Sequence, residues 1–551
     1  MKSSDWFRDA VVYQLYIRSF YDSNGDGIGD LRGVIDKLEV IASLGVNTLW
    51  LSPFCASPNQ DNGYDVSDYR SVDPDLGTLA DLEELLAKAH EKNLRVLMDF
   101  VVNHTSSQHP WFQEAKASRS SRYRNWYYWA DGRHADTSNH GGPPNNWDSY
   151  FGGSAWTLSE ETGQWYLHHF LPSQPDLNWE NPEVRQEMFS IARWWLEKGI
   201  DGFRLDAVHH LGKPQGLPDA PGNLRLKQFK NTRRTHAYLR EFRKAVLEPW
   251  GAVAIGETGG TTPSTALLYT ARQHELDAIF HFDQFFLPNP RAQDFLKNHE
   301  SWYRKFSGQH ARDTAFFSNH DQGRHLSLWG DDRYLRRRSA QFFAAILLTS
   351  WGTPFIYQGE ELGMGNAGFT QPSDFQDQAS LRRYHEALQQ GQDPELALAH
   401  LLMYGRDNAR TPYSWSAAPQ AGFTKGMAWL KPAYDYETIN WENQQGEADS
   451  VWEFYRRLIR FRQENPALRQ GRWVRWSQHP HVYAVQRGKW PNLIALVGNW
   501  SREFVTWSLP RSPGEQGTWT VQLANYPGAS PALKTGKVTL RPWEVSILSP
   551  R

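Results

Sequence analysis

The stretch LRVLMDFVVNH (94–104) carries the pattern on which the fold prediction rests. Its apolar residues run almost without interruption, and polar residues follow where the run ends. A strand that is buried on both faces has this appearance, which is typical of parallel sheets covered by helices. The stretch therefore predicts a parallel strand with Asp99, Asn103 and His104 at or just beyond its carboxyl end.

Seven further runs have the same character, and segments with helical periodicity separate several of them. In one such segment Leu31, Val34, Leu38 and Ile41 fall on a single helix face. The eight predicted strands lie at 11–20, 46–54, 94–104, 201–208, 252–258, 277–285, 313–321 and 353–362. Eight buried strands that alternate with helices predict an α/β protein built on a (β/α)8 TIM barrel.

Two parts of the chain break this alternation. Residues 105–173, after the third strand, are rich in Trp, Tyr, Asn and Gly and predict an inserted subdomain with little regular structure. Residues 472–551 contain short strands separated by turn residues, which predicts a C-terminal antiparallel β-sandwich. The barrel would then comprise residues 1–104 and 174–471.

The composition excludes several classes of protein. Lys and Arg total 59 and Asp and Glu total 61, and this balance argues against nucleic acid or an anionic membrane as the main partner. The single cysteine, Cys55, excludes an internal disulfide and a Cys-rich zinc site. No apolar run is long enough to span a bilayer, and the N-terminus lacks a signal-peptide pattern, so we expect a cytoplasmic protein.

Four of the predicted strands end in polar and charged residues. The active site of a (β/α)8 barrel lies at the carboxyl ends of its strands, so these residues should share one rim. They are Asp99, Asn103 and His104 on the third strand, Arg204 and Asp206 on the fourth, Glu257 on the fifth, and Asn319, His320 and Asp321 on the seventh. Their convergence indicates a catalytic site rather than a set of unrelated loop caps.

Carboxylates without a serine or cysteine nucleophile motif indicate glycosidic-bond chemistry, in which one attacks the anomeric carbon and another protonates the leaving oxygen. Arg204 and Asp206 share a strand face, and the cation should keep Asp206 ionised as a nucleophile requires. Glu257 is then the candidate acid and Asp321 a candidate binder of sugar hydroxyls. Spacing alone leaves these roles open.

The segments DFVVNHT, GFRLDAV, GET and NHD, in this order, resemble the four signature regions of the α-amylase family, glycoside hydrolase family 13. The resemblance covers nearly the whole chain, including QPDLNWENP and GRDNARTPYSW, and points to the oligo-1,6-glucosidase and dextran glucosidase branch. It implies Asp206 as nucleophile, Glu257 as general acid/base and Asp321 as transition-state stabiliser.

The resemblance also implies a set of substrate-binding residues. Tyr64 falls on the family's stacking tyrosine, and Asp61 and Arg410 match a pair that closes the pocket in exo-acting members. The full implied set is Asp61, Tyr64, His104, Arg204, His320 and Arg410. Phe151, Phe170, His209 and His210 could line the same site, although core packing or an ordinary loop position would explain them equally well.

The loop DSNGDGIGD (22–30) matches the start of an EF-hand calcium loop, with oxygen-bearing residues at positions 1, 3, 5 and 9 and glycine at position 6. It departs from that pattern because Gly33 occupies position 12 and the loop follows a strand. We expect a structural Ca²⁺ ion, which the family resemblance also implies, bound by Asp22, Asn24, Asp26, the Ile28 carbonyl and Asp30. The alternative is an Asx-rich turn without metal.

These expectations describe a retaining, exo-acting α-glucosidase that releases terminal glucose from small oligosaccharides, with some transglucosylation. Trehalose-6-phosphate hydrolase, a maltase-like α-1,4-glucosidase and sucrose isomerase use the same machinery and are alternatives. A non-catalytic, transporter-associated scaffold is a rival from another class, but this chain keeps all three carboxylates. The oligomeric state is left open between monomer and homo-oligomer.

Two signals conflict on the linkage that is cleaved. The segment QPDLN (174–178) resembles the form found in α-1,6-acting members of the family. Residue 207, directly after the candidate nucleophile, is Ala, whereas α-1,6-specific members typically carry Val there. We therefore expect α-1,6 activity accompanied by α-1,4 activity.

Overall fold

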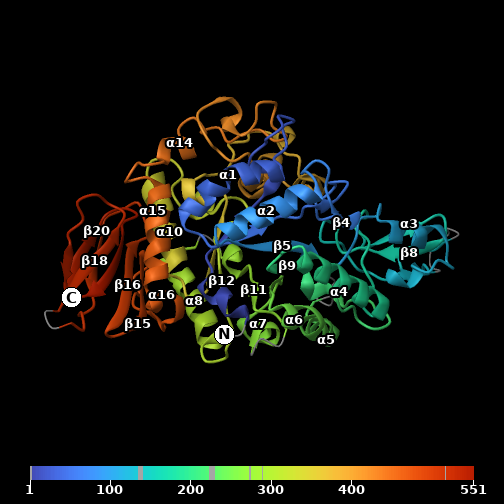
Figure 1. Cartoon of the computed structure of the whole chain (residues 1–551), viewed down its shortest axis with the longest axis horizontal. Helices are drawn as coiled ribbons and strands as arrows, with labels where there is room; N and C mark the ends of the chain where they lie inside the picture. Colours follow the sequence, from blue (N-terminus) through green and yellow to red (C-terminus); the bar gives the residue numbers. More distant parts are fainter. Residues whose placement is uncertain (1–2, 134–139, 223–229, 272–274, 288–289, 515–516) are drawn as a thin grey trace.

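An eight-stranded parallel sheet forms the centre of the computed structural model, which describes residues 3–133, 140–222, 230–271, 275–287, 290–514 and 517–551 (Figure 1). Its strand order is β11-β10-β9-β5-β2-β1-β13-β12. The strands are β1 (Val12–Leu15), β2 (Thr48–Leu51), β5 (Arg95–Val101), β9 (Gly202–Asp206), β10 (Val253–Glu257), β11 (Ala278–Phe280), β12 (Thr314–Ala315) and β13 (Thr353–Tyr357). Thr314 Oγ1 donates to the Ile279 carbonyl over 2.9 Å and links the two terminal strands, so the predicted barrel is confirmed.

Helices surround this barrel, and their sequences explain their limits. Helix α1 (Leu31–Leu44) begins after Asp30, whose carboxylate accepts a hydrogen bond from Gly33 N, and ends at Gly45, which has a left-handed φ of 96°. Its predicted apolar face is buried. Other long helices are α2 (Leu79–Glu91), α4 (Pro182–Glu197), α5 (Arg233–Phe242), α8 (Ala292–Phe306), α10 (Arg336–Thr349), α11 (Gln378–Gln389), α12 (Pro394–Tyr404) and α15 (Val451–Glu464).

The alternation of side chains along the strands places charged groups inside the barrel. Leu97 on β5 and Ile255 on β10 pack in the barrel interior, whereas Phe203 and Leu205 on β9 pack beneath the helices. Because successive strand residues face opposite ways, the interior positions at the carboxyl ends follow directly. They are Asp99, Arg204, Asp206 and Glu257.

The segment inserted after β5 has more regular structure than expected. It contains helix α3 (Pro110–Ala117) and an antiparallel sheet of β6 (Trp129–Ala130), β8 (Gln164–Leu167) and β7 (Trp156–Ser159), in that spatial order. Its aromatic residues supply a local core, in which the Phe112 and Trp129 rings stack with centroids 5.7 Å apart. The chain returns to the barrel through Leu177, whose N–H donates to the Asn103 carbonyl.

The C-terminal part of the chain is an antiparallel all-β structure, as predicted. A six-stranded sheet has the order β14-β15-β16-β21-β18-β19, and β17 pairs with β20 in a second sheet. The strands are β14 (Trp473–Arg475), β15 (Val482–Lys489), β16 (Asn492–Asn499), β17 (Val505–Leu509), β18 (Thr518–Ala524), β19 (Ala532–Lys534), β20 (Gly536–Leu540) and β21 (Val545–Pro550). A shared apolar cluster that includes Ala495, Leu509 and Leu540 joins the two sheets.

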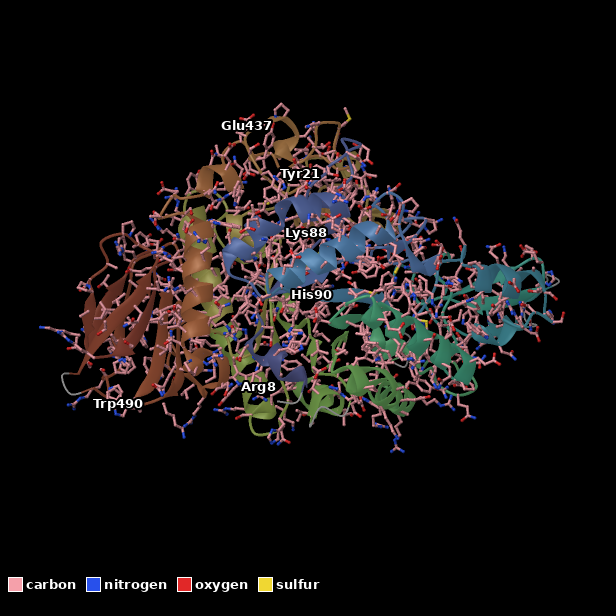
Figure 2. The ribbon with its side chains drawn as sticks, viewed as in Figure 1. Arg8, Tyr21, Lys88, His90, Glu437 and Trp490 are labelled. Atoms are coloured by element: carbon pink, nitrogen blue, oxygen red, sulfur yellow. The ribbon has the colours of Figure 1, made fainter. Side chains whose placement is uncertain are left out.

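The inserted segment and the C-terminal sheets lie at opposite ends of the molecule's long axis (Figure 1). Trp490, in the turn between β15 and β16, is 53% exposed at the outer edge of the C-terminal sheets (Figure 2). In the part of the chain that the structure describes, no helix combines the length and apolar character needed to cross a membrane. The exact domain limits, 105–173 and 472–551, stay predictions.

Candidate active site

Arg204 joins three carboxylates at the carboxyl end of the barrel. Its Nη1 lies 2.8 Å from Asp99 Oδ1 and 2.7 Å from Asp206 Oδ1, and its Nη2 lies 2.7 Å from Glu257 Oε2. The Arg204 side chain is only 3% exposed. A planar guanidinium bonded to two carboxylates fixes their mutual position, so Asp206 and Glu257 face the same small volume.

The turn after β9 completes the position of Glu257. Ala207 has the left-handed conformation φ 45°, ψ 35°, and its N–H donates to Glu257 Oε2 over 3.2 Å. The backbone of the turn after β9 thus holds the Glu257 carboxylate in place.

Asp321 lies between two guanidiniums and a histidine ring. Its Oδ1 lies 3.0 Å from Arg406 Nη1 and 3.1 Å from Arg410 Nη2, and its Oδ2 lies 3.2 Å from His320 Nε2. Burial would raise the pKa of Asp321, but His320 and the two guanidiniums outweigh burial and hold the pKa well below its usual range. Asp321 is therefore ionised whenever the protein is folded at neutral pH.

The expected pair of Asp61 and Arg410 is not formed. Asp61 Oδ1 instead lies 3.3 Å from Arg406 Nη2, and Asp61 Oδ2 accepts from Gln174 Nε2 over 3.0 Å. Arg410 is fully buried at the end of the short helix α13 (Asp407–Arg410), where its Nε donates to the His320 carbonyl. Arg406, just before that helix, lines the pocket in its place.

Tyr64 lines the pocket beside Asp321, and His320 packs against the Tyr64 ring. Their rings stack with centroids 5.4 Å apart, and Tyr64 Oη lies 2.5 Å from His320 Nε2. Gln14 Nε2 donates to His320 Nδ1 over 2.8 Å, which places the proton of a neutral His320 on Nε2. The Tyr64 hydroxyl in turn donates to Asp99 Oδ2, so this wall is tied to the Arg204 cluster.

A buried lysine beside His104, Lys213, was not predicted from the sequence. Lys213 Nζ lies 2.7 Å from Asp176 Oδ2 and donates to Asn103 Oδ1 and to the His210 carbonyl. Lys213 thus connects three segments: the end of β5, the segment in which the inserted part of the chain returns to the barrel, and the turn after β9. The neighbouring His104 Nε2 donates to the Tyr64 carbonyl over 3.0 Å.

These residues surround a pocket of about 300 Å³. Phe151, Phe170, His209 and His210, for which the sequence left two interpretations, all line it. The predicted residues that line it are Asp61, Tyr64, His104, Asp206, Glu257 and Asp321, with Ala207, Lys230, Phe282, Phe286, Arg383 and Arg406 among the others.

The two carboxylates proposed for catalysis differ in proton affinity. Burial raises the pKa of Glu257 to about 8, against the influence of Arg204. Burial also raises the pKa of Asp206 to about 6; the Arg204 charge opposes this rise and the Asp99 charge adds to it. At neutral pH Asp206 is therefore mostly ionised and Glu257 mostly protonated, and this order of the two pKa values suits a nucleophile and an acid.

In the loop 22–30, the Asp22 side chain accepts hydrogen bonds from the backbone of the loop itself. Asp22 Oδ1 accepts from Asn24 N and Gly25 N, and Asp22 Oδ2 accepts from Gly27 N. Tyr21, which precedes the loop, lies against α1, where Lys37 Nζ is 4.1 Å from the centre of its ring (Figure 2). Within the described ranges, no three or more His, Cys, Asp or Glu side chains form a group that could hold a metal ion.

The family of the chain follows from comparison with known proteins. The family model for the α-amylase catalytic domain matches residues 14–471. The chain belongs to the α-amylase family. It is therefore a glycoside hydrolase of family 13, and its fold is that of the family.

Relatives within the α-amylase family share nearly the full length of the chain. The oligo-1,6-glucosidase of Parageobacillus thermoglucosidasius is 38% identical over 561 residues, which cover 98% of each chain. The trehalose-6-phosphate hydrolase of Escherichia coli is 39% identical over 551 residues, also 98% of each. The isomaltulose synthase of Klebsiella superposes with a TM-score of 0.94 at 35% identity, covering 99% of both chains.

We expect a bell-shaped dependence of kcat/KM on pH. Asp206 must be ionised to attack, so activity should rise as pH passes its pKa of about 6. Glu257 must be protonated to donate, so activity should fall as pH passes its pKa of about 8. Rates on a chromogenic α-glucoside across both limbs would test this, and activity that climbed steadily into the alkaline range would contradict the assignment of Glu257.

Proposed function

We propose that the protein is a retaining, exo-acting α-glucosidase that removes terminal glucose from short α-glucosides. One observation carries the proposal: Asp206 and Glu257 contact the same Arg204 guanidinium, each over 2.7 Å. Two carboxylates held by one guanidinium suit the short separation of retaining glycosidases, which leaves no room for a water molecule between the sugar and the second carboxylate, Asp206. The Asp61–Arg406 ion pair lines the same pocket and would close one end of it. A closed end suits an enzyme that binds the terminal glucose of a sugar chain.

The reaction follows from the protonation states of the two carboxylates. Ionised Asp206 attacks the anomeric carbon while protonated Glu257 gives its proton to the glycosidic oxygen. The bond between the anomeric carbon and that oxygen breaks. A covalent β-glucosyl ester remains on Asp206. Ionised Glu257 then removes a proton from water, which attacks the same carbon and releases α-glucose. A sugar hydroxyl in place of water would give transglucosylation.

A rate panel on isomaltose, maltose, trehalose, trehalose-6-phosphate and sucrose would test the proposed substrate class. We expect the highest kcat/KM on isomaltose, with maltose cleaved as well. Failure to hydrolyse any of these sugars would contradict the proposed function. Conversion of sucrose to an isomer would instead favour the sucrose isomerase alternative.

Trehalose-6-phosphate hydrolysis is a second candidate, favoured by the charge of the pocket lining. Lys230 and Arg383 line the pocket together with Arg406, and cationic side chains in the lining would favour a phosphorylated sugar. Two relatives of similar identity have this activity by name. A clear preference for trehalose-6-phosphate over trehalose and isomaltose in the same panel would identify it.

Replacement of Ala207 by Val should shift the linkage preference. A valine would add two methyl groups at a residue that lines the pocket and should disfavour maltose more than isomaltose, by about 1–3 kcal/mol. The left-handed backbone at Ala207 strains a β-branched residue, so the variant should also be less stable by about 1–2 kcal/mol. The kcat/KM ratio of isomaltose to maltose and the melting temperature would measure the two effects.

Ala207→Ser is the matched control for that variant, because its side chain is small and unbranched. It should leave the ratio nearly unchanged. A wild-type enzyme that cleaves maltose well and ignores isomaltose would show that Ala207 outweighs the QPDLN segment.

We propose in addition that the loop 22–30 binds a structural Ca²⁺ ion. Asp22 and Asp30 are both 4% exposed, and in the described part of the chain neither forms an ion pair, so buried negative charge there would gain from a cation. Burial raises the pKa of Asp30, and the charge of Asp22 adds to that. Binding would require the carboxylates to come closer together than they lie in the structure.

Removal of calcium should lower stability more than activity. A ligand at a hundredfold excess over its Kd stabilises the folded state by about 2.7 kcal/mol. Strong chelator should therefore lower the melting temperature, and added Ca²⁺ should restore it in wild type but not in Asp26→Ala. Asp36→Ala, an exposed carboxylate on α1, is the control. The site would be refuted if protein confirmed to contain the metal and protein confirmed to lack it gave identical melting curves.

The cytoplasmic location and the oligomeric state remain predictions. The sole cysteine, Cys55, is buried, and burial raises the pKa of its thiol, so it would be inert in a reducing compartment.

A further inference from the structure

A second, larger groove lies behind the end of the active-site pocket. It has a volume of about 1390 Å³, more than four times the 300 Å³ of the pocket. Its walls come from the loop 59–62, the loop 171–173, helix α11 (Gln378–Gln389) and Trp429. None of the three catalytic carboxylates lines it.

The groove and the pocket share one thin wall. Asp61 and Arg406, which form an ion pair, line the pocket. Gln60 and Asn62, on either side of Asp61, line the groove. Gln376, next to the Asp377 that also binds Arg406, lines it too. Successive residues of the 60–62 loop therefore face two different cavities.

The lining of the groove suits a neutral polyhydroxylated ligand. Six of its eighteen described lining residues carry side-chain amides, and only one, Glu386, carries a carboxylate. Amides both donate and accept hydrogen bonds, which matches sugar hydroxyls. The side chains of Gln60, Asn62 and Gln389 make no hydrogen bond to the described part of the chain, so these amides are available.

Trp429 and Arg18 add a flat, amphipathic surface at one side of the groove. The Arg18 guanidinium lies 4.8 Å from the centre of the Trp429 ring, and the Trp429 carbonyl accepts a hydrogen bond from the Gln376 side chain. A half-buried indole beside amides is the combination that holds the apolar face of a sugar while its hydroxyls are bound.

We propose that this groove is a non-catalytic binding site for an oligosaccharide of glucose, separate from the active-site pocket. This proposal rests on the proposed function in one respect: the ligand is taken to be made of glucose because the proposed substrates are. A chain held there would lie close to the blind end of the pocket, and the enzyme would bind two oligosaccharides at once.

Calorimetric titration of the Asp206→Asn variant with isomaltopentaose, extended into the millimolar range, tests the proposal. We expect two binding events, a tighter one in the pocket and a weaker one in the groove. Adding Gln60→Ala and Gln389→Ala should weaken the second event at least fivefold and leave the first unchanged. Adding Gln390→Ala and Gln392→Ala, two exposed glutamines that do not line the groove, is the matched control and should preserve both events.

A single binding event, or a second event that survives loss of Gln60 and Gln389, would overturn the proposal. Hydrolysis of a short chromogenic α-glucoside by the otherwise wild-type protein reports the proposed function independently. Hydrolysis with only one binding event would therefore reject the groove alone. Two events without hydrolysis would support the groove and reject the proposed function.

Discussion

Asp206→Asn should reduce kcat by roughly 10⁴-fold or more, because an amide cannot form the glucosyl ester on which the reaction depends. The change is nearly isosteric and keeps an oxygen to accept from Arg204 Nη1, which lies 2.7 Å away. The fold should therefore survive, and the melting temperature should change little. Rates on a chromogenic α-glucoside, with melting curves beside them, would measure both.

Asp99→Asn is the matched control for this variant. Asp99 also accepts from Arg204 Nη1, over 2.8 Å, but it does not line the pocket. Its replacement should disturb Arg204 without removing a reacting atom and should cost much less activity. Near-normal turnover by Asp206→Asn, or a glucosyl ester trapped on another residue, would disprove the assignment of the nucleophile.

Glu257→Gln should slow hydrolysis of natural disaccharides by about 10²–10⁴-fold, because the departing sugar then leaves without a proton. A substrate with a good leaving group needs no proton in the first step, so its glycosylation should be much less affected. The alkaline limb of the pH profile, which reflects the Glu257 pKa of about 8, should disappear. Leaving-group dependence and pH profiles of wild type and variant would show this.

Azide is a small nucleophile that needs no general base. In the Glu257→Gln variant it should speed turnover of substrates with a good leaving group, because it can attack the glucosyl ester on Asp206 directly. Equal losses on good and poor leaving groups would count against Glu257 as the acid, and would suggest that it only holds Arg204 and the Ala207 turn.

The barrel and strand β9, which carries Asp206, could be predicted from the sequence because they depend on local periodicity. Arg204 and Asp206 share a face at a spacing of two residues, and β9 places both inside the barrel. The assignment of roles between Asp206 and Glu257 came from the family resemblance rather than from spacing. Their order of pKa depends on burial, which the sequence does not display.

The errors concern contacts between distant segments. Arg406 and Arg410 stand four residues apart in one motif, and only the position of helix α13 decides which of them reaches Asp61. Lys213 follows two histidines in an unremarkable loop, and its contact with Asp176 depends on how the inserted segment returns to the barrel. No local pattern in the sequence marks either contact.

The placement of the C-terminal sheets has a practical consequence for immobilised use of the enzyme. The C-terminus lies at one end of the long axis, and the inserted segment, which supplies Phe151 and Phe170 to the pocket, lies at the other (Figure 1). A surface tether or fusion partner joined at the C-terminus would therefore stand far from the pocket mouth. Attachment there should leave the route of sugars from bulk solution unobstructed, whereas coupling through the inserted segment would crowd it.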